Sequence, residues 1–213
     1  MDTQSNEEAL TVEQLVFGTL VQKFKLPIRI ITQINDICDG HENLPPYNDH
    51  LVGKIANEFL LRHVFPDELK EFFLGLFKGY LASVNKEFYP CDLDDVWYND
   101  MRANEYNPFH FHRSRSSDLG LSSVLMLKRP ENYGEEYSME DTPRNGYLSF
   151  MTGARDPLAV SMFSIDAQVG DFFIFPYSML HGVYPFNGTN EVRRTLSYNC
   201  NVRMDKNYLS ADS

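Results

Sequence analysis

The second half of the chain is divided into short apolar segments of strand length, and this division restricts the possible folds more than any other feature. Turn-forming residues separate the segments, as in an antiparallel β structure. The expected strands are Val96–Met101, Leu119–Leu127, Gly146–Met151, Val160–Ile165, Asp171–Phe175 and Arg193–Arg203. We therefore predict that the part of the chain after Pro90 forms a β sandwich or a barrel.

The first half of the chain combines expected strands with an expected helix. Two apolar runs, Leu15–Phe17 and Ile28–Ile31, lie in a stretch that we predict to be β-rich. The residues of the next stretch, 39–48, include glycine, proline and asparagine, which indicates a surface connection. After it, Leu51, Ile55 and Phe59 recur at four-residue spacing. This spacing predicts a first helix beginning near residue 49.

A second helix is predicted to begin after Pro66. Asp67 and Glu68 would lie in its first turn, where the helix dipole favours acidic groups. An apolar stripe with the period of a helix follows, and its members are Leu69, Phe72, Phe73, Leu76, Phe77, Tyr80, Leu81 and Val84. A chain of 213 residues with helices followed by strands is expected to form one domain, with the helices packed on one outer face of the β structure.

Charge and cysteine content exclude several classes of protein. The 30 acidic and 19 basic side chains give a formal charge of −11, which repels phosphate backbones, so a nucleic-acid partner is not expected. The cysteines, Cys38, Cys91 and Cys200, are odd in number and widely spaced, unlike a secreted disulfide framework. We find no signal peptide and no apolar run of the ~18 residues that cross a bilayer. A cytoplasmic protein without a membrane partner is expected.

Three histidines in the β half have the spacing of metal ligands. In an extended segment, residues i and i+2 share a face, so His110 and His112 of YNPFHFH can direct both imidazoles at one ion. His181, in GDFFIFPYSMLHGVYP, would supply a third imidazole from a distant strand. Such a triangular face leaves open positions for oxygen and a chelating substrate, which suits Fe(II). The other histidines are interpreted as ordinary polar groups: His41, His50 and His63.

The expected last strand has one polar and one mostly apolar face. The polar face contains Arg193, Thr195, Ser197, Asn199, Asn201 and Arg203. Solvent would be the ordinary environment for such a face. However, an arginine with a hydroxyl two residues further on is well suited to a carboxylate, because the guanidinium fork makes two parallel charge-assisted bonds. Arg193 with Thr195 is therefore a candidate carboxylate site.

The order of the motifs adds a family resemblance. YNPFHFH, LGLSSVLML, GYLSF, GDFFIFPYSMLHGVYP and RRTLSYN follow one another as in Fe(II)- and 2-oxoglutarate-dependent oxygenases. The chain resembles this family over roughly 96–202, and especially its branch from marine phages and bacteria. The resemblance implies a single α+β domain in which residues 91–205 form a double-stranded β-helix, a jelly-roll barrel. Residues 1–90 would supply strands and two supporting helices, and a phage-encoded protein would act in the host cytoplasm.

The resemblance also implies roles for the histidines. His110 and His181 correspond to iron ligands of the family. His112 departs from the family pattern, since that position usually holds Asp or Glu, and the departure gives three imidazoles in place of two imidazoles and one carboxylate. Asp118 is the alternative to His112 as the remaining ligand.

For the cosubstrate, the resemblance implies that Arg193 binds the distal carboxylate of 2-oxoglutarate with help from Thr195. Arg194 is the alternative anchor, although strand alternation groups Arg193 with Thr195. Leu125 and Met126 stand where related sequences often have tyrosines that help to bind 2-oxoglutarate.

The implied activity is a dioxygenase reaction that uses O2 and couples decarboxylation of 2-oxoglutarate to succinate with hydroxylation of a C–H bond. The substrate would be a peptide, a protein or a small molecule, and the oligomeric state stays open. Two alternatives remain. A cupin-like protein would use the three histidines without 2-oxoglutarate, as a dioxygenase, an isomerase or a metal sensor, and would not require Arg193 with Thr195. A structural protein would retain the barrel with a vestigial site and bind no stoichiometric metal.

Overall fold

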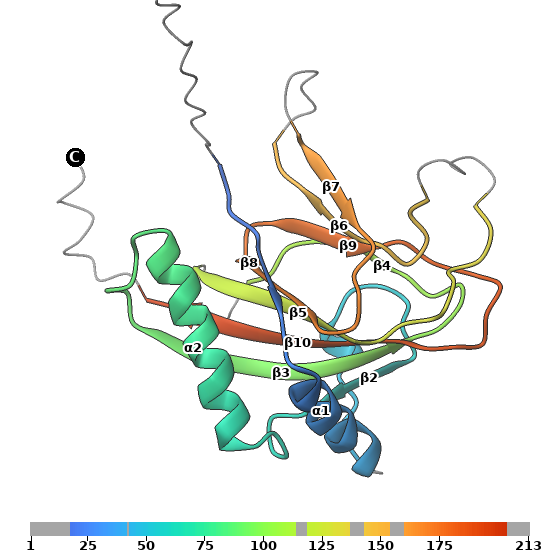
Figure 1. Ribbon diagram of the computed structural model, residues 1–213, viewed down its shortest axis with the longest axis horizontal. Coiled ribbons are helices and arrows are strands. Elements are labelled where there is room, and N and C mark those ends of the chain that lie inside the picture. The colour runs from blue at the N-terminus through green and yellow to red at the C-terminus, as the bar shows by residue number, and fades with distance from the viewer. Residues whose placement is uncertain (1–17, 42, 114–118, 137–142, 154–159, 204–213) are drawn as a thin grey trace, which may run out of the picture.

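Two antiparallel sheets, packed face to face, make up most of the computed structural model, which describes residues 18–41, 43–113, 119–136, 143–153 and 160–203 (Figure 1). The larger sheet has the strand order β1-β8-β5-β10-β3-β2, and the smaller has the order β4-β9-β6-β7. In the larger sheet the strands are β1 (Gln22–Lys25), β2 (Asn57–Leu60), β3 (Cys91–Met101), β5 (Gly120–Lys128), β8 (Asp171–Pro176) and β10 (Arg193–Val202). The strands of the smaller sheet are β4 (Asn107–His110), β6 (Leu148–Met151), β7 (Met162–Ile165) and β9 (Leu180–Val183).

This arrangement confirms the predicted jelly roll and corrects one part of it. Each of the six strands expected in the second half is present, with ends that differ by a few residues. The two sheets, however, are hydrogen-bonded as separate units, so the described strands do not close into a barrel. The open space between the sheets can therefore hold a site.

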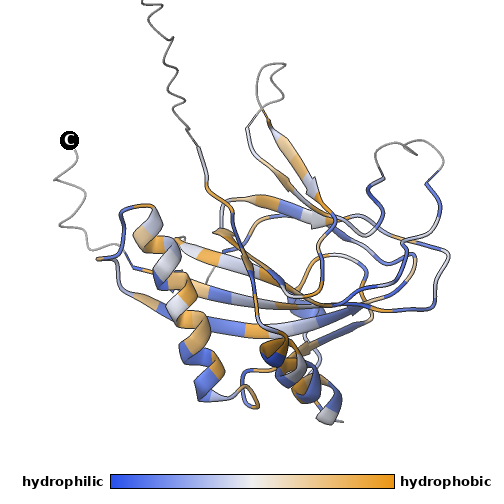
Figure 2. Ribbon diagram, viewed as in Figure 1, coloured by the Kyte–Doolittle hydropathy of each residue, from blue (hydrophilic) through white to orange (hydrophobic). Residues whose placement is uncertain are grey.

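Two helices cover the outer face of the larger sheet, as predicted (Figure 1). They are α1 (Ile28–Gly40) and α2 (Asp67–Ser83), and the apolar stripe along α2 faces the strands (Figure 2). Phe73 and Phe77 of α2 contact Tyr198 of β10 within one buried cluster. In the described part of the chain, neither helix has the length and apolar character needed to cross a membrane.

The strand expected at Ile28–Ile31 is wrong, because these residues begin α1. Its buried residues are Ile30, Ile31, Ile34 and Cys38, which lie on one face of a helix. Burial of this face against the sheet outweighs the β propensity of the isoleucines. The other expected run, Leu15–Phe17, lies outside the described residues.

The helix expected to begin near residue 49 is also wrong. A short 3-10 turn, η1 (Asn48–His50), is followed by β2, in which Phe59 pairs with Tyr98 of β3. Gly53 has a φ of +113°, which a right-handed helix does not allow. The second predicted helix is confirmed, since α2 begins at Asp67 after Pro66.

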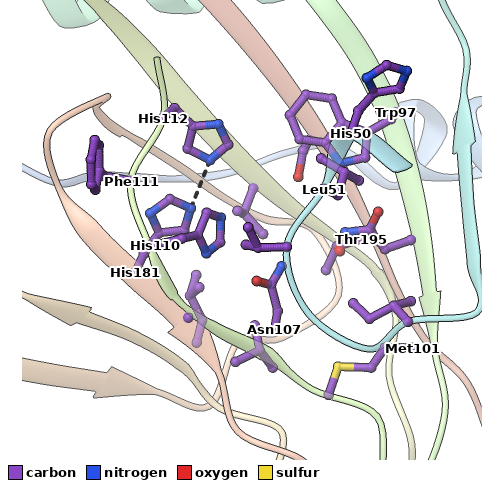
Figure 3. Close-up of a pocket in the computed structure, with 18 of the residues that line it drawn as sticks. His50, Leu51, Trp97, Met101, Asn107, His110, Phe111, His112, His181 and Thr195 are labelled. Atoms are coloured by element: carbon purple, nitrogen blue, oxygen red, sulfur yellow. Dashed lines mark hydrogen bonds between the residues drawn. The ribbon is translucent and has the colours of Figure 1, made fainter. Parts of the chain in front are cut away.

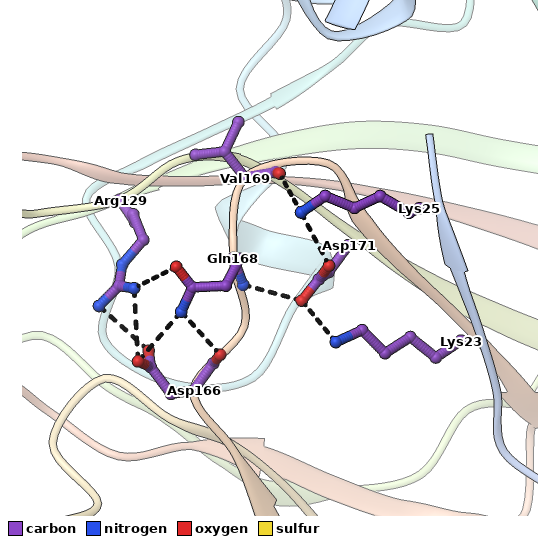
Figure 4. Close-up of polar contacts among 7 residues, drawn as sticks. All are labelled: Lys23, Lys25, Arg129, Asp166, Gln168, Val169 and Asp171. Carbon is purple, nitrogen blue, oxygen red and sulfur yellow. Dashed lines mark hydrogen bonds and ion pairs between the residues drawn. The ribbon is translucent and has the colours of Figure 1, made fainter. Parts of the chain in front are cut away.

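A buried carboxylate attaches the N-terminal strand to the larger sheet (Figure 4). Asp171, at the start of β8, is paired with Lys23 at 2.8 Å and with Lys25 at 3.1 Å, both from β1. Its second oxygen also accepts a bond from the backbone N–H of Gln168 at 2.9 Å. These contacts fix β1 against β8, whose inner face contributes to the core between the sheets.

The polar face of β10 points inward, between the two sheets. Arg193, Thr195 and Ser197 are buried, whereas Leu196 and Tyr198 belong to the cluster under the helices. The predicted alternation is therefore confirmed, but the polar face meets an interior cavity instead of solvent.

Candidate active site

Strand pairing brings two histidines together. β4 and β9 are antiparallel neighbours, and His110 lies directly opposite His181. Gly182 allows this close pairing, because a Cβ at that position would lie 3.0 Å from Asn107 O and from Phe109 N. A larger residue would separate the strands and the two imidazoles.

His112 completes the cluster from the segment that follows β4. Its backbone N–H donates to Tyr177 O at 2.9 Å, and this bond holds the segment after β4 beside the other two histidines. Its Nε2 lies 3.1 Å from Nε2 of His181. One ligand atom from each of the three imidazoles lies within 4.8 Å of the others (Figure 3). The structure thus brings together the three histidines that the sequence spacing selected.

Backbone carbonyls orient two of the rings. Nδ1 of His110 lies 2.8 Å from Pro108 O, and Nδ1 of His181 lies 2.9 Å from Met179 O. A carbonyl can only accept, so each Nδ1 carries the proton and each Nε2 keeps a free lone pair. This arrangement is the usual one for a metal-binding histidine.

Burial keeps the imidazoles neutral. It lowers the pKa of His112 to about 3, with a further contribution from His110. It also holds the pKa of His181 well below its ordinary value and lowers that of His110. The cluster therefore offers uncharged nitrogen ligands at neutral pH, as binding of a divalent metal requires.

A cavity of about 210 Å³ adjoins the histidines between the sheets (Figure 3). Its walls combine the three imidazoles with the polar face of β10 and with apolar side chains. Besides the histidines, the lining includes Ile55, Trp97, Asn99, Met101, Val124, Leu148, Val183, Arg193, Thr195 and Ser197. A small ligand could contact the metal site and β10 at the same time.

Arg193 brings a positive charge into this cavity. Its side chain is 2% exposed, and Nε donates to Gly146 O at 2.9 Å, but Nη2 has no hydrogen-bond partner. None of the ion pairs among the described residues includes it. Burial lowers its pKa, whereas neighbouring Tyr133 raises it. A buried cation without a counterion is costly, so the cavity favours an anionic ligand.

Arg194, the alternative anchor, lies on the opposite face of β10. Its guanidinium makes two bonds to Asp100, at 2.6 and 2.7 Å, and a third to Asp39 at 2.7 Å. These carboxylates bind Arg194 to β3 and α1 on the helix side of the sheet. Asp118, the alternative metal ligand, lies outside the described residues.

Tyr133 is a candidate residue that the sequence did not suggest. It follows β5 in a polar connection, and its buried hydroxyl lies beside the guanidinium of Arg193 without a hydrogen bond of good geometry. Gly146 accommodates its ring, because a Cβ there would lie 2.3 Å from it. Gly146 O also accepts the bond from Nε of Arg193, so the side chains of Arg193 and Tyr133 meet around one glycine. Neither periodicity nor spacing could place this tyrosine beside Arg193.

Comparison with known proteins agrees with this geometry. Residues 95–199 match the family described as "Putative 2OG-Fe(II) oxygenase". No curated protein matches the sequence. Among solved structures, a Pseudomonas putida prolyl-4-hydroxylase is 16% identical, with a TM-score of 0.56 and coverage of 87% of this chain and 92% of that one. HygX from Streptomyces hygroscopicus with iron bound is 12% identical, with a TM-score of 0.56 and coverage of 86% and 82%.

A viral collagen prolyl hydroxylase from Paramecium Bursaria Chlorella virus-1, solved as its 2-oxoglutarate complex, is also similar. It is 13% identical, with a TM-score of 0.53 and coverage of 85% of this chain and 96% of that one. At these identities the structural likeness shows the fold. The family match covers the β core, and the similar structures have the fold of Fe(II)- and 2-oxoglutarate-dependent oxygenases.

The matching family and the similar structures are oxidoreductases of the dioxygenase type, whose cofactor and cosubstrate are Fe(II) and 2-oxoglutarate. The residues in the cavity fit both. Three neutral imidazoles suit a divalent metal, and the unpaired donor of Arg193 suits a carboxylate.

Proposed function

We propose that the chain is an Fe(II)- and 2-oxoglutarate-dependent hydroxylase whose site is formed by His110, His112, His181 and Arg193. One observation carries this proposal. A buried arginine with an unpaired donor lines the same cavity as three convergent imidazoles. A metal alone would not require Arg193, and a carboxylate alone would not require the histidines. A chelating dicarboxylic acid requires both.

Each polar residue then has a defined task. The histidines hold iron through Nε2, while Arg193 and Thr195 bind the distal carboxylate of 2-oxoglutarate and so fix its orientation. Tyr133 is placed to donate a further hydrogen bond to that carboxylate. When bound, the iron and 2-oxoglutarate supply the chemistry that activates O2 and yields succinate.

Apolar side chains limit the access of water to the cavity. Met101, Val124, Leu148 and Val183 line the cavity between the histidines and β10. They lower the local dielectric and strengthen the pairing of Arg193 with a carboxylate.

The substrate is proposed to enter from a second hollow on the other side of His112. This hollow of about 580 Å³ shares Trp97, His112 and Arg113 with the cavity and extends to Tyr47 and Asp95. We favour a peptide or protein substrate, supported by the prolyl hydroxylases among the similar structures, including one solved with a hypoxia inducible factor fragment. A small molecule is the alternative, since HygX has been solved with hygromycin B.

A reducing, cytoplasmic compartment is part of the proposal. Cys38, Cys91 and Cys200 are all free thiols, which supports a reducing environment. If a phage encodes the chain, this compartment is the host cytoplasm.

A second candidate function rests on His112. Three histidines without a carboxylate ligand are also the ligand set of the cupin-like alternative, which does not use 2-oxoglutarate. The unpaired Arg193 favours the first proposal, because a cupin-like reaction gives it no role.

Production of succinate tests the two functions directly. Purified protein with Fe(II) and O2 is incubated with 2-oxoglutarate, with and without pools of peptides or small molecules. We expect slow uncoupled succinate formation that increases with the correct pool. An Fe(II)-loaded protein that forms no succinate and shows no affinity for 2-oxoglutarate would overturn the proposal and favour the cupin-like function.

A further inference from the structure

We propose that Asn199, supported by Ser122, is a positioning residue that fixes the ring orientation and tautomer of His112; this inference rests on the proposed metal site. The side-chain amide nitrogen of Asn199 lies 3.4 Å from Nδ1 of His112. The hydroxyl of Ser122 donates to Oδ1 of Asn199 at 3.0 Å. A chain of contacts thus connects β5, through β10, to one proposed ligand.

His112 needs such a partner because its position differs from that of the other two histidines. His110 and His181 each direct Nδ1 at a backbone carbonyl of the residue two places earlier. For His112, the contact at Nδ1 comes from the side chain of Asn199. His112 lies beyond the end of β4, so strand pairing does not fix its ring. A carboxylate at this position would have no tautomer to select, whereas an imidazole does.

Metal binding determines the tautomer of His112 and therefore the kind of partner that its Nδ1 needs. Coordination through Nε2 of His112 requires the proton on Nδ1, and that N–H needs an acceptor. A half-turn of the Asn199 amide brings Oδ1 toward Nδ1 and Nδ2 toward Ser122. The hydroxyl of Ser122 can accept as readily as it donates, so the pair remains satisfied in both orientations. The same contacts can therefore serve the ring before and after metal binding.

The fold holds Asn199 firmly in this place. Its neighbours Tyr198 and Cys200 are buried in the cluster under the helices. Tyr198 pairs with Val96 of β3 and Cys200 pairs with Leu93, so the single residue Asn199 lies opposite two residues of β3. A β-bulge of this kind re-aims side chains next to a site. Ser122 is 1% exposed and equally fixed.

Titration of Co(II) into the metal-free protein without O2 tests the inference. The readouts are the Co(II) absorption spectrum and the fluorescence of Trp97, the single tryptophan, whose ring centroid lies 6.2 Å from that of His112. We expect Asn199→Leu to weaken Co(II) binding by roughly 10- to 100-fold, as loss of a ligand's supporting hydrogen bond typically does, and to change the spectrum. Asn199→Asp keeps an acceptor for Nδ1–H and should retain the wild-type affinity or exceed it.

Ser122→Ala should weaken binding less than Asn199→Leu, because it removes only the support. The matched control is Ser123→Ala, since the adjacent buried hydroxyl donates to Tyr198 O instead, and it should bind Co(II) as the wild type does. If Asn199→Leu does not fold, Asn199→Ala removes the amide without added bulk. Wild-type Co(II) affinity and spectrum in Asn199→Leu or Asn199→Ala would overturn the inference. So would a loss of affinity in Asn199→Asp as large as that in Asn199→Leu. A wild-type protein that binds no Co(II) would instead overturn the proposed metal site.

Discussion

Arg193 and Arg194 are adjacent in the chain, yet their guanidinium groups lie on opposite faces of β10 and in opposite electrostatic environments. Arg194 is paired with Asp100 and Asp39 on the helix side of the sheet. Arg193 lies on the cavity side and keeps an unpaired donor. The alternation of a single strand therefore separates a structural arginine from a candidate ligand-binding one.

Replacement of Arg193 should lower the affinity for 2-oxoglutarate, whereas replacement of Arg194 should lower the stability of the fold. Arg193→Ala removes the partner of a buried carboxylate, which typically costs at least about 2 kcal/mol, so we expect 2-oxoglutarate affinity to fall by about thirty-fold or more. Iron content should not change. Anaerobic titration of 2-oxoglutarate into the Fe(II) protein, followed by the charge-transfer absorbance of a chelated keto acid, measures this affinity.

Arg194→Ala is the matched control. It leaves Asp100 without its main partner, so urea unfolding should show a stability loss of about 3 kcal/mol, typical of a broken, largely buried pair, with unchanged 2-oxoglutarate affinity. Loss of affinity in Arg194→Ala but not in Arg193→Ala would show that Arg194, and not Arg193, binds 2-oxoglutarate.

The sequence predicted those features of the site that depend on a local period. Alternation placed Arg193, Thr195 and Ser197 on one face, and the i, i+2 rule grouped His110 with His112. Such rules act within a single strand, so a short sequence segment is enough to apply them. The neighbours of that strand are set by the whole sheet, so alternation alone could not decide whether the polar face meets solvent or a cavity.

Residues from loops and bulges could not be predicted in the same way. Tyr133 reaches Arg193 from an irregular connection, and Asn199, although alternation placed it on the polar face of β10, contacts His112, which lies in a segment outside the strands. The two wrong elements have local causes as well. A run of β-branched residues concealed the helical period of α1. Near residue 49 the apolar spacing suggested a helix, but Gly53, with its positive φ, does not allow one.

Loss of a proposed ligand should abolish stoichiometric metal binding. His110→Ala and His181→Ala each remove a nitrogen that no neighbouring described side chain replaces, so elemental analysis of the Fe(II)-loaded variants should show little iron. The exposed His63 provides a control, because His63→Ala removes an imidazole that does not belong to the cluster. Full iron content in either ligand variant would show that the ligand set is wrong.

His112→Asp restores the carboxylate that the family usually has. We expect Fe(II) affinity to persist or rise, because a negative ligand attracts the cation more strongly than a neutral imidazole. The affinity of the Fe(II) protein for the 2-oxoglutarate dianion should fall, since the positive charge of the centre is then reduced. Parallel titrations of Fe(II) and 2-oxoglutarate measure the two effects. A folded variant that loses iron would mean that this position requires an imidazole, and would favour the cupin-like function.

Tyr133→Phe should weaken binding of 2-oxoglutarate without affecting the metal. The substitution removes one buried hydroxyl and keeps the ring, and a hydrogen bond to a charged group is worth about 1.5 kcal/mol or more, so affinity should fall by roughly ten-fold. Tyr147→Phe is the control, because this neighbouring ring packs edge-on against Tyr133 but is only partly buried. Equal affinities in wild type and Tyr133→Phe would exclude the hydroxyl from the cosubstrate site.

Stability should fall as the pH rises through neutrality because of Glu58. Glu58 is 3% exposed, and burial, with a smaller contribution from Glu105, raises the pKa of its carboxyl group to about 7. A pKa raised above the unfolded value of about 4.3 means that the folded state holds the proton more tightly. Its contribution to stability is therefore complete below that value and is lost as the pH rises through about 7.

The shift corresponds to a loss of at most about 4 kcal/mol. Glu58→Gln cannot ionise, so it should match the wild type near pH 4 and exceed it in stability near pH 8. Urea unfolding across this range measures the difference, and Glu71→Gln, at an exposed position of α2, is the control for removing one negative charge. Parallel pH profiles for wild type and Glu58→Gln would mean that the buried carboxyl group ionises in the folded protein as it does in the unfolded chain.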